Sequence, residues 1–285
     1  MITIFTPTYN REITLRKLYN SLIIQENKNF EWLVIDDGST DDTEALINEF
    51  SKSSHFPIRY VYQQNAGKMS AYNKGIELAE GEIFICVDSD DYLLKDATKI
   101  ISEYFEKIND PFICGVAFHN MNRETKKVSG TMFPRNDLVA NHQELYYKYH
   151  IKGDKNFVFK TDCLKEYKHP IQGQEKFVPE AVLFNRIGEK YSFLCVNECV
   201  VSIEYMSDGY SNNYAQLAKN NPLGHVLYYK ELFNYQKSLY NIYCYIYFSF
   251  ISGIKLTNIF KDHQSKLLVF LLIGPTYMVF LKKGR

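Results

Sequence analysis

The sequence predicts an α/β protein with a parallel sheet in its N-terminal part and a helical, apolar C-terminal region. Three observations support this prediction. Short β-rich runs alternate with helix-like segments through the first 107 residues, polar clusters follow three of those runs, and two long uncharged runs lie after residue 237. Alternation of strand and helix along a chain is typical of a parallel sheet with crossover helices.

Eight segments make up this alternation. The expected strands are Ile2–Phe5, Trp32–Ile35, Arg59–Tyr62 and Ile83–Val87, and the expected helices lie near Ile13–Ile24, Thr43–Phe50, Ser70–Ala79 and Ala97–Phe105. Ser39 followed by Asp42 is typical of a capping box, which predicts that Ser39 caps the start of the second helix. Residues 36–38 are then expected to form a strand-to-helix loop.

The alternation is lost after residue 110. Strands are expected at 112–118, 156–160 and 191–203, with a polar turn at 122–130 and a helix near 179–187. This second half is expected to extend the sheet and to build the second wall of a cleft.

Composition limits the classes of function. The 33 basic and 33 acidic residues give a net charge of zero, which offers no electrostatic case for nucleic acid as a partner. Residues 255–285 nevertheless hold six basic residues and one acidic residue, so this tail carries +5. The six cysteines form no CxxC pair and the N-terminus has no secretory signature, so reduced thiols and a cytoplasmic chain are expected.

Three polar clusters stand at the expected carboxyl ends of strands: Thr6–Asn10, Asp36–Ser39 and Asp88–Asp91. In open α/β sheets this edge is where ligands bind. The last cluster packs three carboxylates into four residues after a buried strand, where repulsion would raise at least one pKa unless a cation neutralises it. Mg²⁺ or Mn²⁺ chelated by a diphosphate suits this arrangement. A solvated loop that caps the next helix is the alternative.

These residues resemble a known family. The similarity to the family 2 glycosyltransferases of GT-A fold rests on four motifs: TPTYN at 6–10, IDDGSTDDT at 35–43, NAGK at 65–68 and GEIFICVDSDD at 81–91. Their order and spacing make the resemblance specific over about the first 95 residues. Residues 177–186 are similar to the acceptor-side segment of a subset of that family.

The resemblance implies roles on the donor side. Thr6 would belong to the nucleotide site, Tyr9 would lie against the base, and Asp37 would accept a hydrogen bond from the base NH, which favours uridine. Asp88 would hold the ribose, and Lys68 would lie beside the base or the phosphates. The alternatives are structural, since Tyr9 could be cleft packing, Asp37 a turn former and Lys68 an exposed lysine near a helix start.

Asp90 and Glu180 would complete the chemistry. The resemblance implies that Asp90 binds Mn²⁺ or Mg²⁺ on the diphosphate. An inverting transfer needs a base for the acceptor hydroxyl, and Glu180 is the candidate because its apolar neighbours could raise its pKa. Many members of the family carry a Glu-Asp or another Asp-containing pair where this chain has Pro179-Glu180, so Glu175 is the reserve candidate. The structural alternative for Glu180 is an acidic residue favoured in the first turn of a helix.

The tail combines apolar runs at 238–254 and 267–281 with flanking lysines. Aromatic residues with basic flanks suit a membrane interface, so a segment that lies on the inner face of the cell membrane is expected. A lipid-linked saccharide, such as a polyprenyl-linked one, would then be the natural acceptor. The alternative is a helical hairpin packed on the protein or in a homodimer.

The expected organisation is a GT-A catalytic domain at 1–212, with a nucleotide-sugar half at 1–110 and an acceptor half at 111–212, and a helical region at 213–285. The expected activity is transfer of a sugar from a UDP-sugar to a saccharide in cell-surface polysaccharide synthesis. A sugar-phosphate nucleotidyltransferase is disfavoured because no GxG occurs. A non-catalytic nucleotide-binding protein of the same fold is the other alternative.

Overall fold

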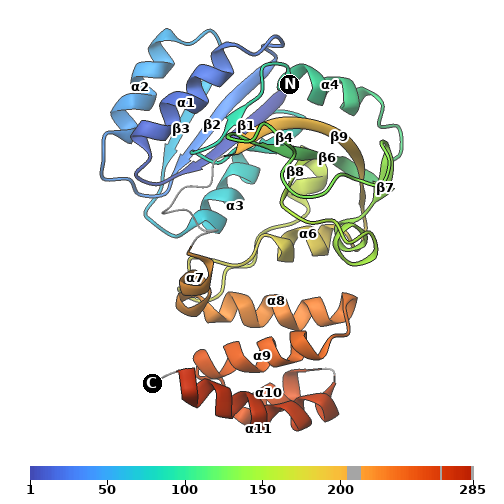
Figure 1. The fold of residues 1–285 in the computed structure, drawn as a ribbon. Helices are drawn as coiled ribbons and strands as arrows, with labels where there is room; N and C mark the ends of the chain where they lie inside the picture. Colours follow the sequence, from blue (N-terminus) through green and yellow to red (C-terminus); the bar gives the residue numbers. More distant parts are fainter. Residues whose placement is uncertain (204–212, 264, 284–285) are drawn as a thin grey trace. The chain divides into compact units, whose positions relative to one another are not determined.

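The computed structural model describes residues 1–203, 213–263 and 265–283, and the chain forms two compact units (Figure 1). The first unit comprises Met1–Lys168 and Leu183–Met206, and the second comprises His169–Val182 and Ser207–Arg285. The domain boundary predicted after residue 212 adjoins residues 204–212, which lie outside the described residues. That functional division stays a prediction.

The first unit is built on one mixed sheet of nine strands. The strands are β1 (Ile2–Thr8), β2 (Phe30–Asp36), β3 (Ile58–Tyr62), β4 (Ile83–Cys86), β5 (Tyr92–Leu93), β6 (Ile113–Asn122), β7 (Leu138–Ala140), β8 (Lys155–Lys160) and β9 (Ser192–Ile203). Their order is β3-β2-β1-β4-β8-β6-β9-β5, and β7 also pairs with β9. The first four strands are parallel, as predicted, whereas β8 is antiparallel to both its neighbours.

Helices cover both faces of this sheet (Figure 1). They are α1 (Glu12–Ile23), α2 (Thr43–Ser53), α3 (Lys68–Leu78), α4 (Ala97–Glu106), a π-helical turn η1 (Glu144–Lys148), α5 (Thr161–Lys165) and α6 (Ala181–Ile187). Because side chains alternate along a strand, Ile4 of β1 packs in a core with α1, α2 and α4, while Phe5 packs with α3 on the other face. The helices pack on the faces of the sheet, so the carboxyl ends of the parallel strands are the edge at which a ligand can bind.

The capping box predicted at Ser39 is wrong. Helix α2 begins at Thr43, and Ser39 lies in the loop before it. The Ser39 hydroxyl accepts a hydrogen bond from the Asn10 backbone NH at 2.8 Å, and its own NH donates to Asp36 Oδ1 at 2.8 Å. The Asp41 carboxylate accepts from the Thr43 NH instead. Ser39 therefore ties the loop after β2 to the end of β1.

The second unit is helical, as predicted. Its helices are α7 (Tyr214–Asn220), α8 (Pro222–Tyr235), α9 (Leu239–Ile251), α10 (Leu256–Asp262) and α11 (Lys266–Lys283). Helix α9 lies between α8 and α11 (Figure 1). Its side chains Ile242 and Ile246 are fully buried in a cluster with Val269 of α11 and Phe233 of α8. The first uncharged run of the tail is therefore largely the core of this unit.

Among the residues that the structure describes, no helix has the length and apolar character needed to cross a membrane.

Candidate active site

The acidic loop Asp88–Asp91 joins β4 to β5 at the carboxyl edge of the parallel strands. The Asp91 NH donates to the Asp88 carbonyl at 3.0 Å, which closes a turn between the two strands. On the far side, Tyr92 and Leu93 pair with Ser202 and Val201 of β9. Both ends of the loop are thus anchored in the sheet, so the carboxylates between them hold a defined arrangement.

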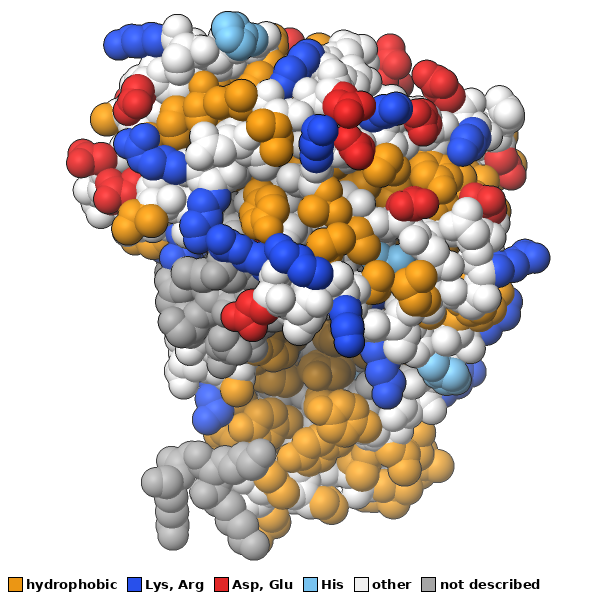
Figure 2. Space-filling model, turned by 45° about the horizontal axis from the view of Figure 1, so that its top comes forward, with side chains coloured by type: hydrophobic (Ala, Val, Ile, Leu, Met, Phe, Trp, Pro, Cys, Tyr) orange, Lys and Arg blue, Asp and Glu red, His pale blue; other side chains and the backbone are white. Residues whose placement is uncertain are grey.

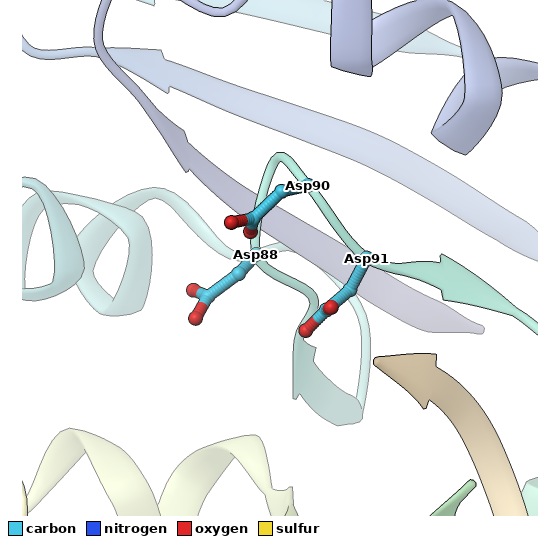
Figure 3. Close-up of side chains that lie close together, drawn as sticks. All are labelled: Asp88, Asp90 and Asp91. Atoms are coloured by element: carbon cyan, nitrogen blue, oxygen red, sulfur yellow. The ribbon is translucent and has the colours of Figure 1, made fainter. Parts of the chain in front are cut away.

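The three carboxylates of this loop lie close together. One oxygen each of Asp88, Asp90 and Asp91 falls within 4.8 Å of the others. In Figure 3 the carboxylates of Asp88 and Asp90 leave the loop toward the same side. Burial, followed by the negative charge of Asp88, raises the pKa of Asp90 above its usual range. A divalent cation would relieve both effects, so the residues present fit a hard metal ion with oxygen ligands.

Lys68, which the family resemblance placed beside the base or the phosphates, lies against this acidic cluster. It is the first residue of α3, and its Nζ is 2.8 Å from each carboxylate oxygen of Asp88. The preceding Gly67 has a φ of 94°, a conformation that suits glycine and turns the chain into the helix. The ammonium cancels one of the three negative charges, which leaves a net charge of −2 in the cluster with the carboxylates ionised.

Asp37 is buried, with 5% of its surface exposed, and its carboxylate organises the loop between β3 and α3. Oδ1 accepts from Gln63 Nε2 at 2.7 Å and from the Ala66 NH at 2.8 Å, and Oδ2 accepts from the Gly67 NH at 2.8 Å. The Asn65 side chain donates to the Asp37 carbonyl at 2.8 Å. These bonds fix the residue next to the one that begins α3, so Asp37 positions Lys68 through the backbone.

The candidates Thr6, on β1, and Tyr9, directly after it, differ in accessibility. Tyr9 is 49% exposed, which leaves its ring open to a ligand. The neighbouring Asn10 holds the loop before α2, because its side-chain oxygen accepts from the Thr40 NH at 2.8 Å. Thr6 is fully buried and its hydroxyl accepts from the indole NH of Trp32 at 3.0 Å. The structure therefore places Tyr9 at the edge of the sheet and Thr6 in the core.

The candidate bases belong to the second unit. Glu180 is half-buried directly before α6, in the apolar surroundings of Phe177, Val178 and Pro179, all of which are buried. Glu175 has a structural task, because its two carboxylate oxygens accept from the NH groups of the second and third residues of α8, both at 2.8 Å. Of the two, Glu180 remains the candidate base, and its role stays a prediction.

Two polar groups that contact the candidate site were not found from the sequence. The side-chain amide of Asn156 on β8 donates to the carbonyl of Cys86, two residues before Asp88, at 3.5 Å. The Oδ1 atom of Asn156 is buried and has no hydrogen-bond partner among the described residues. Gln63 holds Asp37. No motif marks either residue, because Asn156 reaches the site only through the antiparallel pairing of β8 with β4.

The fold and the site define an α/β protein whose ligand edge carries an aromatic ring, a lysine and a cluster of carboxylates. A comparison with protein families identifies it further. The model of glycosyl transferase family 2 matches residues 3–168, and the chain belongs to this family.

Relatives and solved structures agree with this assignment. An uncharacterized glycosyltransferase of Rickettsia conorii is 35% identical over 47% of this chain and 23% of its own length. A Campylobacter jejuni protein, GalNAc(5)-diNAcBac-PP-undecaprenol beta-1,3-glucosyltransferase, is 27% identical over 67% of this chain and 61% of its own. The chain thus spans less than two thirds of either relative.

Solved glycosyltransferase structures share the fold. Staphylococcus aureus TarS 1-349 aligns with a TM-score of 0.61 and 14% identity, over 100% of this chain and 92% of TarS. Its complex with UDP-GlcNAc aligns with a TM-score of 0.57 and 18% identity over the same shares. The mannosyltransferase PcManGT from Pyrobaculum calidifontis, in complex with GDP-Man and Mn²⁺, gives 0.57 at 16% identity over 99% of this chain and 74% of its own. The GT-A fold predicted from the sequence is confirmed.

Proposed function

We propose that this protein is an inverting glycosyltransferase that moves a sugar from a UDP-sugar to a lipid-linked saccharide in cell-surface polysaccharide synthesis. The observation that carries the proposal is the acidic cluster Asp88–Asp91 paired with Lys68 at the carboxyl edge of the sheet. The UDP-GlcNAc complex of TarS supports a UDP-sugar donor, and the undecaprenol-linked substrate named for the Campylobacter enzyme supports a lipid-linked acceptor. Cytoplasmic, peripheral attachment to the inner face of the cell membrane follows from such an acceptor.

The donor side binds and orients the nucleotide. The exposed ring of Tyr9 offers a flat face for the base. Three donors already hold the Asp37 carboxylate, and the remaining lone pair of one oxygen would accept from the uracil NH. The Asp88 carboxylate would accept hydrogen bonds from the ribose hydroxyls. Lys68, which pairs with this carboxylate, would then interact with the phosphates of the donor as well. Lys68 would then stabilise negative charge on the diphosphate.

The metal-binding and acceptor residues would carry the transfer itself. Asp90, with Asp88 and Asp91 beside it, would hold Mn²⁺ or Mg²⁺, whose Lewis acidity stabilises the leaving diphosphate. Glu180 would take the proton of the acceptor hydroxyl as that oxygen attacks the anomeric carbon from the face opposite the diphosphate. The C1–O bond to the acceptor forms as the bond to UDP breaks, so a single displacement inverts the configuration.

Isothermal titration of UDP and GDP, with and without Mn²⁺, tests the donor site. We expect UDP to bind more tightly than GDP and to need both Mn²⁺ and Asp90, so that Asp90→Ala weakens UDP binding in the presence of Mn²⁺ by about tenfold or more. The matched control is Asp96→Ala, because Asp96 is exposed and its side chain caps no helix. Equal UDP affinity in the wild type and Asp90→Ala would remove the basis of the proposal.

A second variant separates an enzyme from a nucleotide-binding protein without activity. Glu180→Gln keeps the shape of the side chain but removes the base, so we expect UDP binding to persist while turnover of the UDP-sugar falls by about 10²-fold or more. Unchanged turnover in Glu180→Gln would assign the base to another residue. If the wild type binds UDP but turns over no UDP-sugar with any lipid-linked acceptor, the protein is the non-catalytic alternative.

A further inference from the structure

Helix α11 has two apolar faces with different surroundings. Val269 and Thr276 are fully buried, and Leu268, Leu272 and Ile273 pack in the same cluster as Ile246 of α9. The opposite side exposes large hydrophobic side chains: Leu267, Phe270, Leu271, Tyr277 and Met278. Leu267 is 71% exposed and Phe270 67%. Counted from Leu267, the other four follow after three, four, ten and eleven residues, which places all five in one stripe along the helix.

The stripe is part of a larger apolar surface on the C-terminal helices. Helix α10, which contacts α11, exposes Leu256 and Phe260. In Figure 2, hydrophobic side chains gather over the C-terminal helices on the face that is shown. Monomeric proteins in water rarely expose contiguous apolar areas of this kind, and such areas mark contact with a membrane or another protein.

The charges around the stripe select between these partners. Lys255, Lys261 and Lys266 are exposed at the ends of α10 and at the start of α11. Asp262 is the one acidic residue in 255–285, against six basic ones. An anionic bilayer offers acyl chains for the stripe and negatively charged headgroups for the lysines. A helix that lies at the boundary between headgroups and acyl chains contacts both at once. A purely apolar protein surface would offer no negative charge to the lysines.

We propose that α11 docks the protein on an anionic membrane, lying along the surface with the Leu267-to-Met278 stripe at the boundary of the acyl chains. Because its inner face packs on α9, the helix can present only its outer face to lipid, so it lies flat instead of leaving the protein. The sequence alone assigned this role equally to residues 238–254, but these contain α9, and seven of its 13 residues are buried. That the membrane also holds the acceptor saccharide rests on the proposed function, whereas the docking itself does not.

Vesicle co-sedimentation of the full chain tests the docking. The probe is vesicles of equal parts phosphatidylglycerol and phosphatidylcholine, compared with vesicles of phosphatidylcholine alone. We expect wild-type protein to bind the anionic vesicles, and Phe270→Glu with Leu271→Glu to lower the partition coefficient by about tenfold or more. Lys261→Gln with Lys266→Gln should lower binding to anionic vesicles and leave weak binding to neutral vesicles unchanged.

The matched control is Ile13→Glu, which changes a side chain that is 74% exposed on α1 of the first unit. It should bind vesicles like the wild type. Wild-type protein that ignores anionic vesicles, or the Phe270/Leu271 variant that binds them equally well, overturns the proposal. If that variant instead turns a dimer into a monomer while the wild type ignores vesicles, the stripe is a contact between copies. UDP titration of the same samples reports separately on the proposed function.

Discussion

Replacing Asp37 by Asn should destabilise the first unit strongly, because the carboxylate accepts three hydrogen bonds with 5% of the residue exposed. If the amide oxygen of Asn takes the place of Oδ1, it keeps Gln63 and the Ala66 NH, but its NH₂ then faces the Gly67 NH at 2.8 Å. One charge-assisted bond is lost, at about 1.5–3 kcal/mol, and two are reduced to neutral bonds, at about 1 kcal/mol each. The sum is a loss of about 3.5–5 kcal/mol.

Urea unfolding monitored by tryptophan fluorescence measures this loss. Trp32 is the only tryptophan of the chain and is fully buried in β2, so its emission reports on the first unit alone. Asp96→Asn is the control, since this exposed side chain makes no capping bond and should change the free energy of unfolding by less than about 0.5 kcal/mol. If Asp37→Asn loses no more than this control, the Asp37 carboxylate does not hold the loop, and the structural part of its role is refuted.

Two further substitutions test other features of the fold. Glu175→Gln should destabilise the second unit by about 1–3 kcal/mol, because one of the two NH groups at the start of α8 then faces an NH₂. Thermal unfolding followed by circular dichroism measures this loss of stability, and unchanged stability contradicts the capping role. Burial lowers the pKa of His142 to about 4, so the native protein takes up this proton later than the unfolded chain as the pH falls from about 6.5 to 4. The free energy of unfolding should therefore decline over this pH range, and His142→Gln should lessen that decline by about 3 kcal/mol. The control is His55→Gln, because His55 is exposed, and it should leave the decline unchanged. Equal declines in the wild type and both variants would refute the role of His142.

Local sequence patterns predicted much of the fold. The parallel arrangement of β1 to β4 follows from alternating apolar runs and helices, and residues at the ends of these strands were placed correctly at one edge of the sheet. The start of α2 near Thr43 was predicted correctly, but its cap was not, because Ser39 has the right spacing for a cap and is instead engaged by Asn10 and Asp36. A competing partner 29 residues away is not visible in a local pattern.

The candidate site shows the same limit. The cluster Asp88–Asp91 and its neighbour Lys68 were predicted from motifs, and the structure brings them together. Thr6 belongs to a motif as well, yet the indole of Trp32 uses its hydroxyl within the core. The sequence made Glu175 the reserve candidate and did not show its capping role, because the backbone that it caps lies 48 residues further along. Tertiary partners, which no local pattern contains, decide these cases.

The anchoring of the acidic loop on two strands has a consequence for how the protein is made. The loop follows β4, but the strand that pairs with its other end is β9. Leu93 can pair with Val201 only after the ribosome has synthesised β9. At roughly 5–20 residues per second, a ribosome needs on the order of 5–20 s to deliver that partner. A nascent chain therefore carries all four residues Asp88–Asp91 well before the sheet can close around them. The acidic cluster therefore takes its final arrangement late in translation, and truncated or stalled chains contain its carboxylates without that arrangement.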